Sequence, residues 1–523
     1  MSISKRPRTK KAGKPPKDAT ASQKEAFTAL LPFCTAQDHG PPVRILSGYA
    51  GTGKTWLAVH LIQAACNKGL RVAVCAPTHK AVSVITNKLQ GAGPVKLWTG
   101  TLHALLGLKL RETHEGDMRI ELDRHPKASY FESYDIVFID ESSMVGPALL
   151  AYIERFVRGS HTKVLYIGDP GQLLPIEPQK TTEASAQQDW IEETTPTKST
   201  PPIFALVPTH HRLTEIVRQQ STGKPHPIVE FAQEIRRYIE GEATGIFHPE
   251  AVCDYLAKHA ADMGAVRLAR ADDIAEGAIS LRRKRPQKDI RVMAWRNRVV
   301  DERNLLIHRG LASIYGAEED QGKQAPFWPG ETLIAREALY GFRLAARMHE
   351  RGAKAWEEAL APYEESSASN GGNNAREDSA SELIPNNTEM KVIRCEAVPH
   401  PYIPIASWRI EAKMTGQENL EFYVADHPRD YQQLVRKTWD EYRGSQARNP
   451  DSFRKAWAIT RACAPVMHNY AMTAHKAQGS TFHYALVDLA DLYRMVATSG
   501  AEEYHRALYV AVTRATERVW LCL

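Results

Sequence analysis

The sequence lacks the usual marks of secreted and membrane-spanning proteins. Its seven cysteines are dispersed over 523 residues without a Cys-x-x-Cys pair, which argues against a disulfide framework or a zinc site. Neither a signal peptide nor an apolar run of about 20 residues is visible, and one or the other marks exported and membrane-spanning chains. We therefore expect a cytoplasmic protein with no membrane partner.

An excess of positive charge is also missing from most of the chain. The formal net charge is +6, yet residues 1–18 alone hold seven Lys and Arg against one Asp, so the remaining residues are neutral overall. Residues 1–20 contain few apolar side chains, and we predict that they form a disordered basic tail. Such a tail could bind phosphates nonspecifically, improve solubility or act as a localisation signal, and charge alone does not separate these roles.

What is present is the composition of an ordinary soluble globular protein, with 43% hydrophobic and 24% charged residues. The length predicts three or four domains. Short apolar runs alternate with segments of helical spacing, a pattern typical of βα units and a mainly parallel sheet. We therefore predict an α/β fold, with strands at residues 43–46, 71–76, 135–139, 163–167, 291–295, 484–489 and 519–523.

One glycine-rich stretch, Gly48-Tyr-Ala-Gly-Thr-Gly-Lys54-Thr55, lies between the first of these strands and a helical segment. Its Gly-x4-Gly-Lys-Thr spacing lets backbone amides surround a polyphosphate at the positive end of a helix. Lys54 is expected to reach the β and γ phosphates, and Thr55 to ligate Mg²⁺. A glycine loop without a nucleotide is the alternative. The expected loop contacts are Gly48, Ala50, Gly51, Thr52, Gly53, Lys54 and Thr55.

Two further polar stretches directly follow buried strands. Asp140 and Glu141 end one of them; beside a phosphate loop, the first acid can hold Mg²⁺ and the second can polarise the attacking water. The two serines that come next also favour a helix cap, which would leave the acids merely solvated. Gln172 follows the next strand, and its amide can sense a γ phosphate or position water.

Other polar residues stand at the ends of predicted elements. Thr78, His79 and Lys80 lie where a strand ends and a helix begins, the edge at which open α/β sheets bind ligands. Arg514 could reach across an interdomain cleft and stabilise charge on a transferring phosphoryl group; a surface salt bridge is the alternative. The adjacent histidines at 210–211 are interpreted as structural, because neighbouring side chains point apart.

Two regions depart from the α/β pattern. Two alternating segments within residues 108–122 flank a polar turn and predict a protruding β-hairpin, either functional or decorative. Residues 326–460 contain short β-like pieces that suggest a small barrel or sheet inserted into an α/β domain. Within this insertion, residues 366–381 are poor in apolar side chains and predict a mobile loop.

Taken in chain order, these segments resemble superfamily 1 helicases and, within them, the RecD/Dda-like 5′ to 3′ branch. The resemblance covers roughly residues 23–219 and 293–516. It implies two RecA-like P-loop NTPase motor domains, with a β-hairpin pin inserted in the first and an SH3-like β-barrel in the second. The implied activity is ATP-dependent 5′ to 3′ unwinding of duplex DNA by a motor that translocates on single-stranded DNA, with ATP and Mg²⁺ as cofactors. A translocase that displaces proteins without unwinding, and a nucleotide-gated scaffold, are the alternatives.

The resemblance also implies residue roles. Gln23 is similar to the family's adenine-reading glutamine, and Lys54 and Thr55 to its phosphate and Mg²⁺ residues. Asp140 and Glu141 resemble the Mg²⁺ and catalytic base pair. Gln172 resembles the γ-phosphate sensor, and Arg218 and Arg514 the two arginines that the second motor domain presents to the nucleotide. The implied DNA-binding residues are Thr78, His79, Lys80, Thr101, His103, Asn297, Thr473, His475 and Gln478.

The implied layout matches the compact phage Dda form, because the extra N-terminal domain of longer RecD-like proteins is lacking. Its expected partners are single-stranded DNA and junctions of single- and double-stranded DNA, with single-strand binding or replication proteins as further candidates. A monomer in the bacterial or phage-infected host cytoplasm is expected. The predicted parts are a basic tail (1–20), motor domain 1A (21–100 and 131–205), the pin hairpin 1B (101–130), motor domain 2A (206–325 and 461–523), and insertion 2B (326–460) with a mobile loop (345–385).

Overall fold

A computed structural model gives the fold of this chain. One compact unit comprises the residues up to Val300 together with Met472–Leu523, and the other is Asp301–Ala471. Residues 1–14 of the predicted tail (1–20) and residues 345–381 of the predicted mobile loop (345–385) lie outside the described residues. The structure describes residues 15–38, 40–89, 97–112, 118–122, 131–175, 202–206, 210–218, 226–259, 264–315, 319–320, 323–337, 339–340, 382–384, 387–414, 419–444 and 450–523.

The first sheet of the larger unit has the strand order β3-β2-β6-β7-β1-β8, and every neighbouring pair is parallel. Strands β2 and β6 are buried along their whole length, as expected for parallel strands covered on both faces. The strands are β1 (Val43–Gly48), β2 (Val72–Ala76), β3 (Leu97–Thr101), β6 (Ile136–Ile139), β7 (Lys163–Gly168) and β8 (His210–Leu213).

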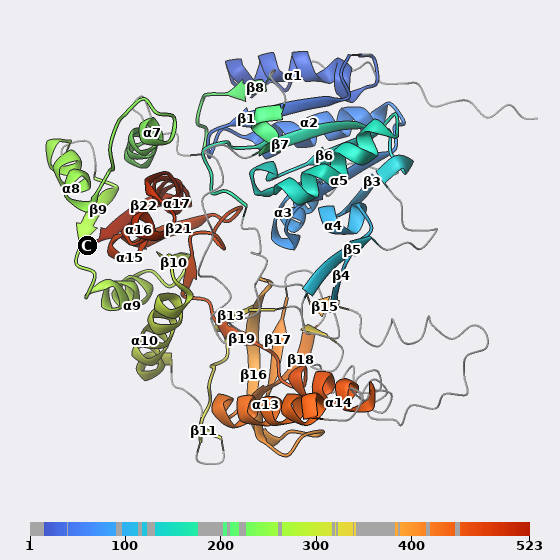
Figure 1. Cartoon of the computed structure of the whole chain (residues 1–523). Helices are drawn as coiled ribbons and strands as arrows, with labels where there is room; N and C mark the ends of the chain where they lie inside the picture. The colour runs from blue at the N-terminus through green and yellow to red at the C-terminus, as the bar shows by residue number, and fades with distance from the viewer. Residues whose placement is uncertain are drawn as a thin grey trace, which may run out of the picture. The chain divides into compact units, whose positions relative to one another are not determined.

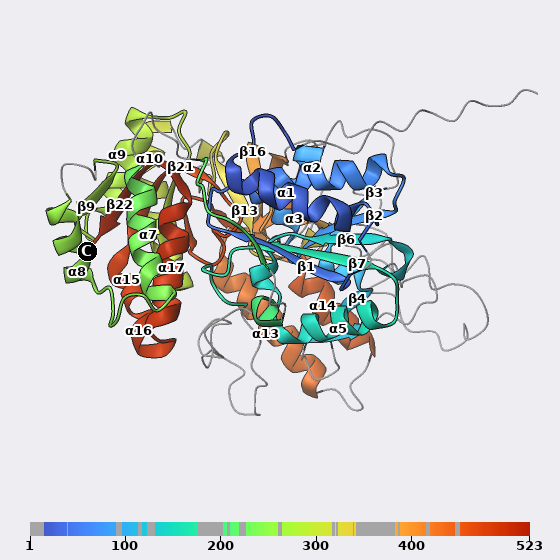
Figure 2. The ribbon, with the colours of Figure 1, turned by 90° about the horizontal axis from the view of Figure 1, so that it is seen from above.

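Helices cover both faces of this sheet because successive strand residues point to opposite sides. Val72 and Val74 pack against helices α1, α2 and α3, whereas Ala73 and Cys75 pack against α4, α5 and α6. Figures 1 and 2 show α1 and α2 on one side of β1 and β7 and α5 on the other. The helices are α1 (Ala21–Cys34), α2 (Lys54–Asn67), α3 (His79–Leu89), α4 (Leu102–Leu105), α5 (Pro147–Arg158) and α6 (Pro202–Leu206).

The second sheet has the order β20-β10-β21-β22-β9, in which β10, β21, β22 and β9 run parallel. Helices α7 and α17 lie side by side against it (Figure 2) and share its core. The strands are β9 (Val266–Ala269), β10 (Ile290–Ala294), β20 (Ala471–Thr473), β21 (Phe482–Asp488) and β22 (Ala515–Cys522). The helices are α7 (Pro227–Ile239), α8 (Pro249–Lys258), α9 (Ile274–Lys284), α15 (Leu489–Tyr493), α16 (Met495–Thr498) and α17 (Ala501–Thr513).

The predicted α/β class with mainly parallel sheets is confirmed, and so are the positions of the apolar strands. The expected boundary at residue 206 needs correction, because β8 pairs with β1 and therefore belongs to the first sheet. Strand β8 contains two histidines and an arginine and is only partly buried, so it carries no apolar run. Strand β3 was also not predicted, since its Leu-Trp-Thr-Gly-Thr sequence has no continuous apolar run. Four of its five residues are only partly buried.

The predicted hairpin is present in the larger unit. Strands β4 (Leu108–Glu112) and β5 (Met118–Leu122) form an antiparallel pair in which Leu108 faces Leu122 and Glu112 faces Met118. Its turn lies between the described ranges. The hairpin begins shortly after α4, so the first sheet carries it beyond the end of β3.

The smaller unit is built on an antiparallel sheet in the order β18-β17-β16-β13-β19. Trp408 and Phe422 lie at its buried core. Strand β19 lies beyond the expected end of the insertion at residue 460. The elements are helix α10 (Asn297–Tyr315), strands β11 (Glu319–Asp320), β12 (Lys323–Gln324), β13 (Thr332–Ala335), β14 (Leu339–Tyr340), β15 (Glu382–Ile384), β16 (Glu389–Pro399), β17 (Ala406–Lys413), β18 (Asn419–Ala425) and β19 (Val466–His468), and helices α13 (Pro428–Gly444) and α14 (Pro450–Thr460).

All seven cysteines are free, as their dispersed positions predict. Within the described ranges, each helix falls short of the length or the apolarity needed to cross a membrane.

Candidate active site

The glycine-rich loop joins the end of β1 to the start of α2. Gly51 and Gly53 have φ angles of 82° and 81°, which are strained for any residue with a side chain. At Gly48 an added Cβ would lie 2.8 Å from the carbonyl oxygen of Leu213, so the neighbouring strand also requires glycine there. The loop therefore has the backbone and the helix N-terminus of an anion-binding turn.

Lys54 is held over this loop. Its Nζ donates hydrogen bonds to the carbonyl oxygens of Gly48 (2.8 Å) and Tyr49 (2.9 Å). Desolvation lowers the pKa of Lys54, and nearby carboxylates, led by Asp169 and Glu141, oppose that shift. The ammonium thus lies between the loop and an acidic cluster, where it can bridge to a bound polyphosphate.

Asp140 and Thr55 meet at the same place. The Thr55 hydroxyl donates to Asp140 Oδ2 at 3.2 Å, and Asp140 is 6% exposed. Burial and the adjacent Glu141 raise the pKa of Asp140 to about 6. A hydroxyl and a buried carboxylate are the hard oxygen ligands that Mg²⁺ prefers, so these residues fit that ion. Glu141 has a φ of 50°, an uncommon conformation for a residue with a side chain.

We expect Asp140→Asn to stabilise the protein at neutral pH in the absence of divalent cations. The pKa of Asp140 is raised on folding, so its ionisation costs stability as pH rises from about 4 to 6, and the cost persists above that range. The variant should therefore be more stable than the native chain at pH 7.5, and the gain should be smaller at pH 4.5, where folded Asp140 is largely protonated. Urea unfolding at pH 4.5 and 7.5 measures it.

Asp135→Asn is the matched control, with the opposite sign. Arg71 hydrogen-bonds this carboxylate (2.7 Å) and holds its pKa below the usual range. Its removal should therefore lower stability at pH 7.5, by less than 1 kcal/mol for such a partly exposed pair. Asp140→Asn protein that is less stable than the native chain at pH 7.5 would contradict the raised pKa of Asp140.

Gln172 follows β7 and is 3% exposed. Its Oε1 is buried without a hydrogen-bond partner among the described residues, and a buried acceptor left unpaired is costly. Its backbone is fixed from two sides, since its N–H donates to the Asp169 carbonyl (3.1 Å) and its own carbonyl accepts from Arg506 (2.8 Å). The side chain is thus available for water or a ligand.

Arg514 follows α17 in the second sheet's layer and is 3% exposed. Its guanidinium donates to Val510 O (3.2 Å), Ser480 O (3.4 Å) and Thr513 Oγ1 (3.1 Å). Burial lowers its pKa, and Glu141 is near enough to oppose that shift. The alternative of a surface salt bridge is therefore wrong, because the side chain is buried and bonded to neutral oxygens.

Glu141 faces the same part of the second sheet. An added Cβ at Gly479 would lie 3.7 Å from Glu141 Oε1, and Gly479 immediately precedes the Ser480 that accepts from Arg514. Residues after β6 of the first sheet and after α17 of the second therefore converge on one site.

The expected origin of Arg218 in the second motor domain is wrong. Arg218 follows β8 of the first sheet, and its N–H and that of Val217 donate to the carbonyl oxygen of Gly51 (3.1 and 2.9 Å). Its guanidinium reaches Thr513 O (3.5 Å). Desolvation and the neighbouring Arg514 lower the pKa of Arg218 to about 10. The two arginines thus approach one another from opposite sheets.

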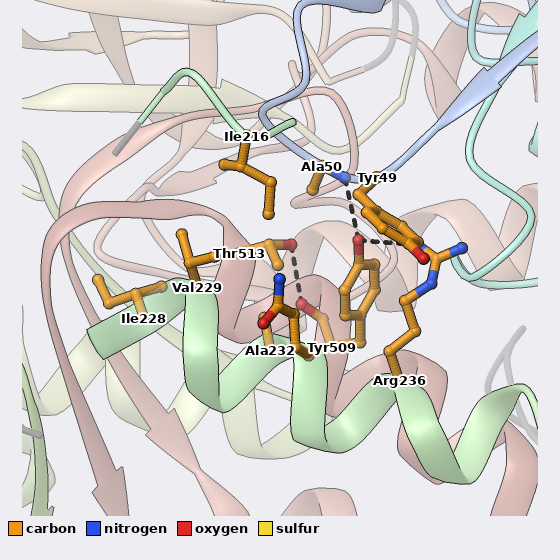
Figure 3. A pocket seen from close by; sticks show the side chains of 10 residues that line it. Tyr49, Ala50, Ile216, Ile228, Val229, Ala232, Arg236, Tyr509 and Thr513 are labelled. Atoms are coloured by element: carbon orange, nitrogen blue, oxygen red, sulfur yellow. Dashed lines mark hydrogen bonds between the residues drawn. The ribbon is translucent and has the colours of Figure 1, made fainter. Parts of the chain in front are cut away.

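A buried network that the sequence did not reveal joins the phosphate loop to the second sheet. The Tyr509 hydroxyl accepts from the Ala50 N–H (3.0 Å) and donates to Asp169 Oδ2 (2.9 Å), and Arg236 donates to Asp169 Oδ1 (3.0 Å). The Arg236 guanidinium also lies 3.6 Å from the centre of the Tyr49 ring. Figure 3 shows Tyr49, Ala50, Arg236 and Tyr509 around a small pocket that residues of the loop, α7 and α17 line.

Charge pairing stabilises this network. Burial would raise the pKa of Asp169, but Arg236 and Lys54 hold it below its usual range. The ion pair is desolvated, with the two side chains 5% and 0% exposed, so loss of one partner would be costly. The available signals were the position of Asp169 directly after a buried strand and the place of Tyr509 on the helix that leads to Arg514.

Gln23, near the start of α1, lies beside the loop. Its Nε2 donates to Thr52 O (2.8 Å) and its Oε1 accepts from the Thr20 N–H (3.0 Å). An added Cβ at Gly53 would lie 2.6 Å from Gln23 Nε2. The glutamine is therefore held by a capping box and touches the loop where the helix α2 begins.

Several of the predicted DNA-binding residues lie at the carboxyl ends of β-strands. The hydroxyls of Thr78, Thr101 and Thr473 each accept a backbone N–H from the residue three positions later, at 3.3, 3.2 and 3.2 Å. They shape the turns after β2, β3 and β20. Burial and the nearby His79 lower the pKa of His103, so the ends of β2 and β3 bring these two histidines together.

The remaining candidates have different surroundings. Gln478 is 8% exposed and donates to Leu173 O at 3.4 Å, so it bridges the layers of the two sheets. His475 Nε2 lies 3.7 Å from Glu503 Oε1. Asn297 is the first residue of α10, and Lys80 lies in the first turn of α3.

Comparisons with known proteins agree with this geometry. An "AAA domain" family model matches residues 19–245, and a "UvrD-like helicase C-terminal domain" model matches residues 468–522. The ATP-dependent DNA helicase dda of Enterobacteria phage T4 is 23% identical over 514 residues, covering 95% of this chain and 97% of that protein. The ATP-dependent RecD2 DNA helicase of Deinococcus radiodurans is 33% identical over 134 residues, covering 25% of this chain and 16% of its own length.

A crystal structure of Pif1 helicase from Candida albicans aligns with a TM-score of 0.46 and 15% identity, over 96% of this chain and 94% of that one. The first family model covers the strands of the first parallel sheet, and the second covers β20, β21 and β22 of the second sheet. The chain thus resembles the RecD/Dda-like helicases of superfamily 1B, over nearly its whole length in the phage protein and over a quarter of its length in RecD2.

Proposed function

We propose that this protein is an ATP-dependent DNA helicase that moves 5′ to 3′ along single-stranded DNA and unwinds duplexes. The observation that carries the proposal is the composite site. Lys54 and Glu141 come from the first sheet, the buried Arg514 comes from the second, and Tyr509 bonds the phosphate loop across the two. A nucleotide bound there would contact both layers, so hydrolysis would change how they are held together.

Each side chain has a role in hydrolysis of the γ phosphate. The Glu141 carboxylate accepts a proton from water as the water oxygen bonds to phosphorus and the bond to the bridging oxygen of ADP breaks. Gln172 orients that water through its unpaired amide oxygen. Lys54 and Arg514 stabilise charge on the transferring phosphoryl group. Thr55 and Asp140 would hold Mg²⁺, which neutralises phosphate charge when bound.

Arg218 and Gln23 complete the proposed nucleotide site. Arg218 is anchored to the loop by Gly51 and faces Arg514, so it can contact phosphate from the first sheet's side. Gln23 is positioned beside Thr52 and Gly53, where its amide can read the adenine base. Through the Asp169–Tyr509–Arg236 network, a change in the conformation of the phosphate loop would be transmitted to α7 and α17.

The proposed DNA path follows the carboxyl ends of the strands in both sheets, with Thr78, His79, Thr101 and His103 on the first. Contacts on each sheet would grip the strand in turn as the site closes and opens, which makes stepping directional. Phosphate and stacking contacts tolerate any sequence. The full proposed set is Thr78, His79, Lys80, Thr101, His103, Asn297, Thr473, His475 and Gln478.

The proposed domain roles extend this assignment. The β4–β5 hairpin acts as the pin that splits the duplex, and the antiparallel sheet of the smaller unit corresponds to the SH3-like insertion 2B. The motor domains 1A and 2A are centred on the two parallel sheets, with β8 and residues 214–218 assigned to 1A. The proposed partners are single-stranded DNA and strand junctions, bound by a monomer.

Strand displacement on tailed duplexes tests the proposal. Duplexes with a 5′ tail should be unwound in the presence of ATP and Mg²⁺, whereas matched duplexes with a 3′ tail or no tail should remain double-stranded. ATPase activity should rise on addition of single-stranded DNA. Preferential unwinding from a 3′ tail would overturn the polarity, and ATPase without DNA stimulation would overturn the motor assignment.

Deletion of residues 111–119 separates a helicase from a translocase that only displaces proteins. The range includes the last residues of β4 and the first of β5, where Arg111 pairs with Arg119 and Glu112 with Met118. Removing them should abolish unwinding and leave DNA-stimulated ATPase within about twofold of the native rate, because the composite site is untouched. Both activities are measured on one preparation. Retention of unwinding in the deletion variant would show that the hairpin is not the pin.

A further inference from the structure

A cluster of two histidines and a glutamate lies in the smaller unit and has no role in the proposed motor. Helix α10 contributes His308, the turn before β13 contributes Glu331, and β19 contributes His468. The potential ligand atoms of the three side chains all lie within 4.8 Å of one another. The cluster thus joins distant segments of the chain, because Glu331 and His468 are 137 positions apart.

The turn that carries Glu331 is defined by its sequence. In Trp328-Pro329-Gly330-Glu331, Gly330 has a φ of 90° and the Glu331 N–H donates to Trp328 O at 3.1 Å. Proline at the second position and glycine at the third are typical of a type II turn. The turn points the Glu331 carboxylate inward, where its side chain is 0% exposed and its Oε2 accepts from the Trp328 N–H (3.3 Å).

The two imidazoles approach the same carboxylate oxygen. His308 Nδ1 lies 3.2 Å and His468 Nδ1 lies 2.7 Å from Glu331 Oε1. Their side chains are only 11% and 16% exposed. Aromatic rings wall the cluster, with Trp328 stacked on His308 at 4.3 Å and Phe327 edge-on to His468 at 5.1 Å.

The negative charge of the Glu331 carboxylate is not fully balanced in this arrangement. A fully buried carboxylate needs a cation or a metal nearby, yet within the described part of the chain the ion pairs of Glu331 involve only the two histidines. Two imidazole nitrogens and one carboxylate oxygen form a ligand set typical of Zn²⁺ sites with three protein ligands. The nitrogen donors favour a transition metal over Mg²⁺ or Ca²⁺.

We propose that His308, Glu331 and His468 bind one divalent transition metal ion of the Zn²⁺ class. Bonds of about 2 Å in a tetrahedral shell separate neighbouring ligand atoms by about 3.3 Å. The His308 nitrogen already meets that spacing, and the His468 nitrogen needs to withdraw by roughly half an ångström. The absence of Cys-x-x-Cys pairs does not bear on this site, because its ligands come from histidine and glutamate.

The metal ion would link α10, the Glu331 turn and β19 within the smaller unit. One turn before His308, Asn304 Oδ1 accepts the N–H groups of Tyr470 and Ala471, both at 2.8 Å. The same face of α10 thus already holds the chain just after β19. A bound ion would add a tie from this face to the Glu331 turn, and this role is independent of whether the protein is a helicase.

Metal binding by the full-length protein tests the proposal. Protein treated with EDTA and desalted is titrated with ZnCl₂ by calorimetry without nucleotide, and metal retained after a second desalting is counted by mass spectrometry. We expect one Zn²⁺ per chain, a higher melting temperature, and visible d–d absorption when Co²⁺ replaces Zn²⁺. Failure of the native protein to retain Zn²⁺ would overturn the site and indicate a hydrogen-bonded cluster only.

Single variants then locate the ion. His308→Gln, Glu331→Gln and His468→Gln should each weaken Zn²⁺ binding at least tenfold and remove the Co²⁺ absorption, with folding checked by circular dichroism. Three variants keep the test valid if one of them fails to fold. His400→Gln removes another buried histidine of the same unit, and Asp140→Asn removes the proposed Mg²⁺ ligand; both should bind Zn²⁺ as the native chain does. Zn²⁺ binding that survives all three cluster variants would overturn the assignment.

Discussion

Glu141→Gln should lower the rate of ATP hydrolysis by about 10²- to 10⁴-fold, with DNA unwinding lost in parallel. The substitution keeps the size of the side chain and removes the carboxylate that accepts the proton from water. Glu141 follows β6 in a conformation with a φ of 50°, and its Oε1 lies near Gly479 of the second sheet's layer. The rest of the loop is untouched, so nucleotide binding should stay within about threefold.

Steady-state ATPase with and without single-stranded DNA, together with binding of a fluorescent nucleotide, measures these two effects separately. Glu132→Gln is the matched control, because Glu132 is an exposed acid that precedes the same strand. It should hydrolyse ATP as the native protein does. If Glu141→Gln keeps more than a tenth of the native rate, another group is the base; if nucleotide binding is lost instead, Glu141 acts in holding the nucleotide.

Arg514→Lys should reduce ATP turnover by about 10³-fold or more, the range found when an arginine that stabilises a phosphoryl transition state is removed. Lysine keeps the positive charge but lacks the planar fork that can contact two phosphate oxygens. Arg514 is 3% exposed and is bonded by Val510, Ser480 and Thr513. Its head group is therefore held in one place before the nucleotide is contacted.

The loss should fall on kcat, with KM for ATP changed less than fivefold, since an interaction made in the transition state affects turnover more than ground-state binding. Arg518→Lys is the control, because Arg518 lies four residues further on and is exposed. A loss confined to KM would assign Arg514 to nucleotide binding. Unchanged turnover in Arg514→Lys would show that the second sheet does not contribute to hydrolysis. The motor proposal would then lose its basis.

Local features account for what could be read without coordinates. The phosphate loop needs Gly51 and Gly53 because their φ angles exclude other residues, so its conformation is encoded in a few adjacent positions. The parallel strands needed apolar runs because they are covered on both faces. Asp140 and Glu141 could be assigned to the site because a strand end next to such a loop places them there.

Features that depend on pairing between distant segments could not be read in the same way. Arg218 was assigned to the wrong sheet because β8 has no apolar run, and only its pairing with β1 shows where it lies. Thr78 was expected where a strand ends, and it lies just after β2, but its hydroxyl also caps the following turn, as those of Thr101 and Thr473 do. Nothing local to these positions distinguishes a capping hydroxyl from a ligand contact.

The sequence by itself determined the α/β class, the phosphate loop, the acidic pair at the end of β6 and the hairpin, because each depends on backbone conformation or burial within a few residues. The tertiary structure alone decided that Tyr509, Asp169 and Arg236 join the loop to α7 and α17, and that His308, Glu331 and His468 meet. Those contacts join residues separated by tens to hundreds of positions. Their geometry is set by how whole sheets and helices pack, which no short pattern specifies.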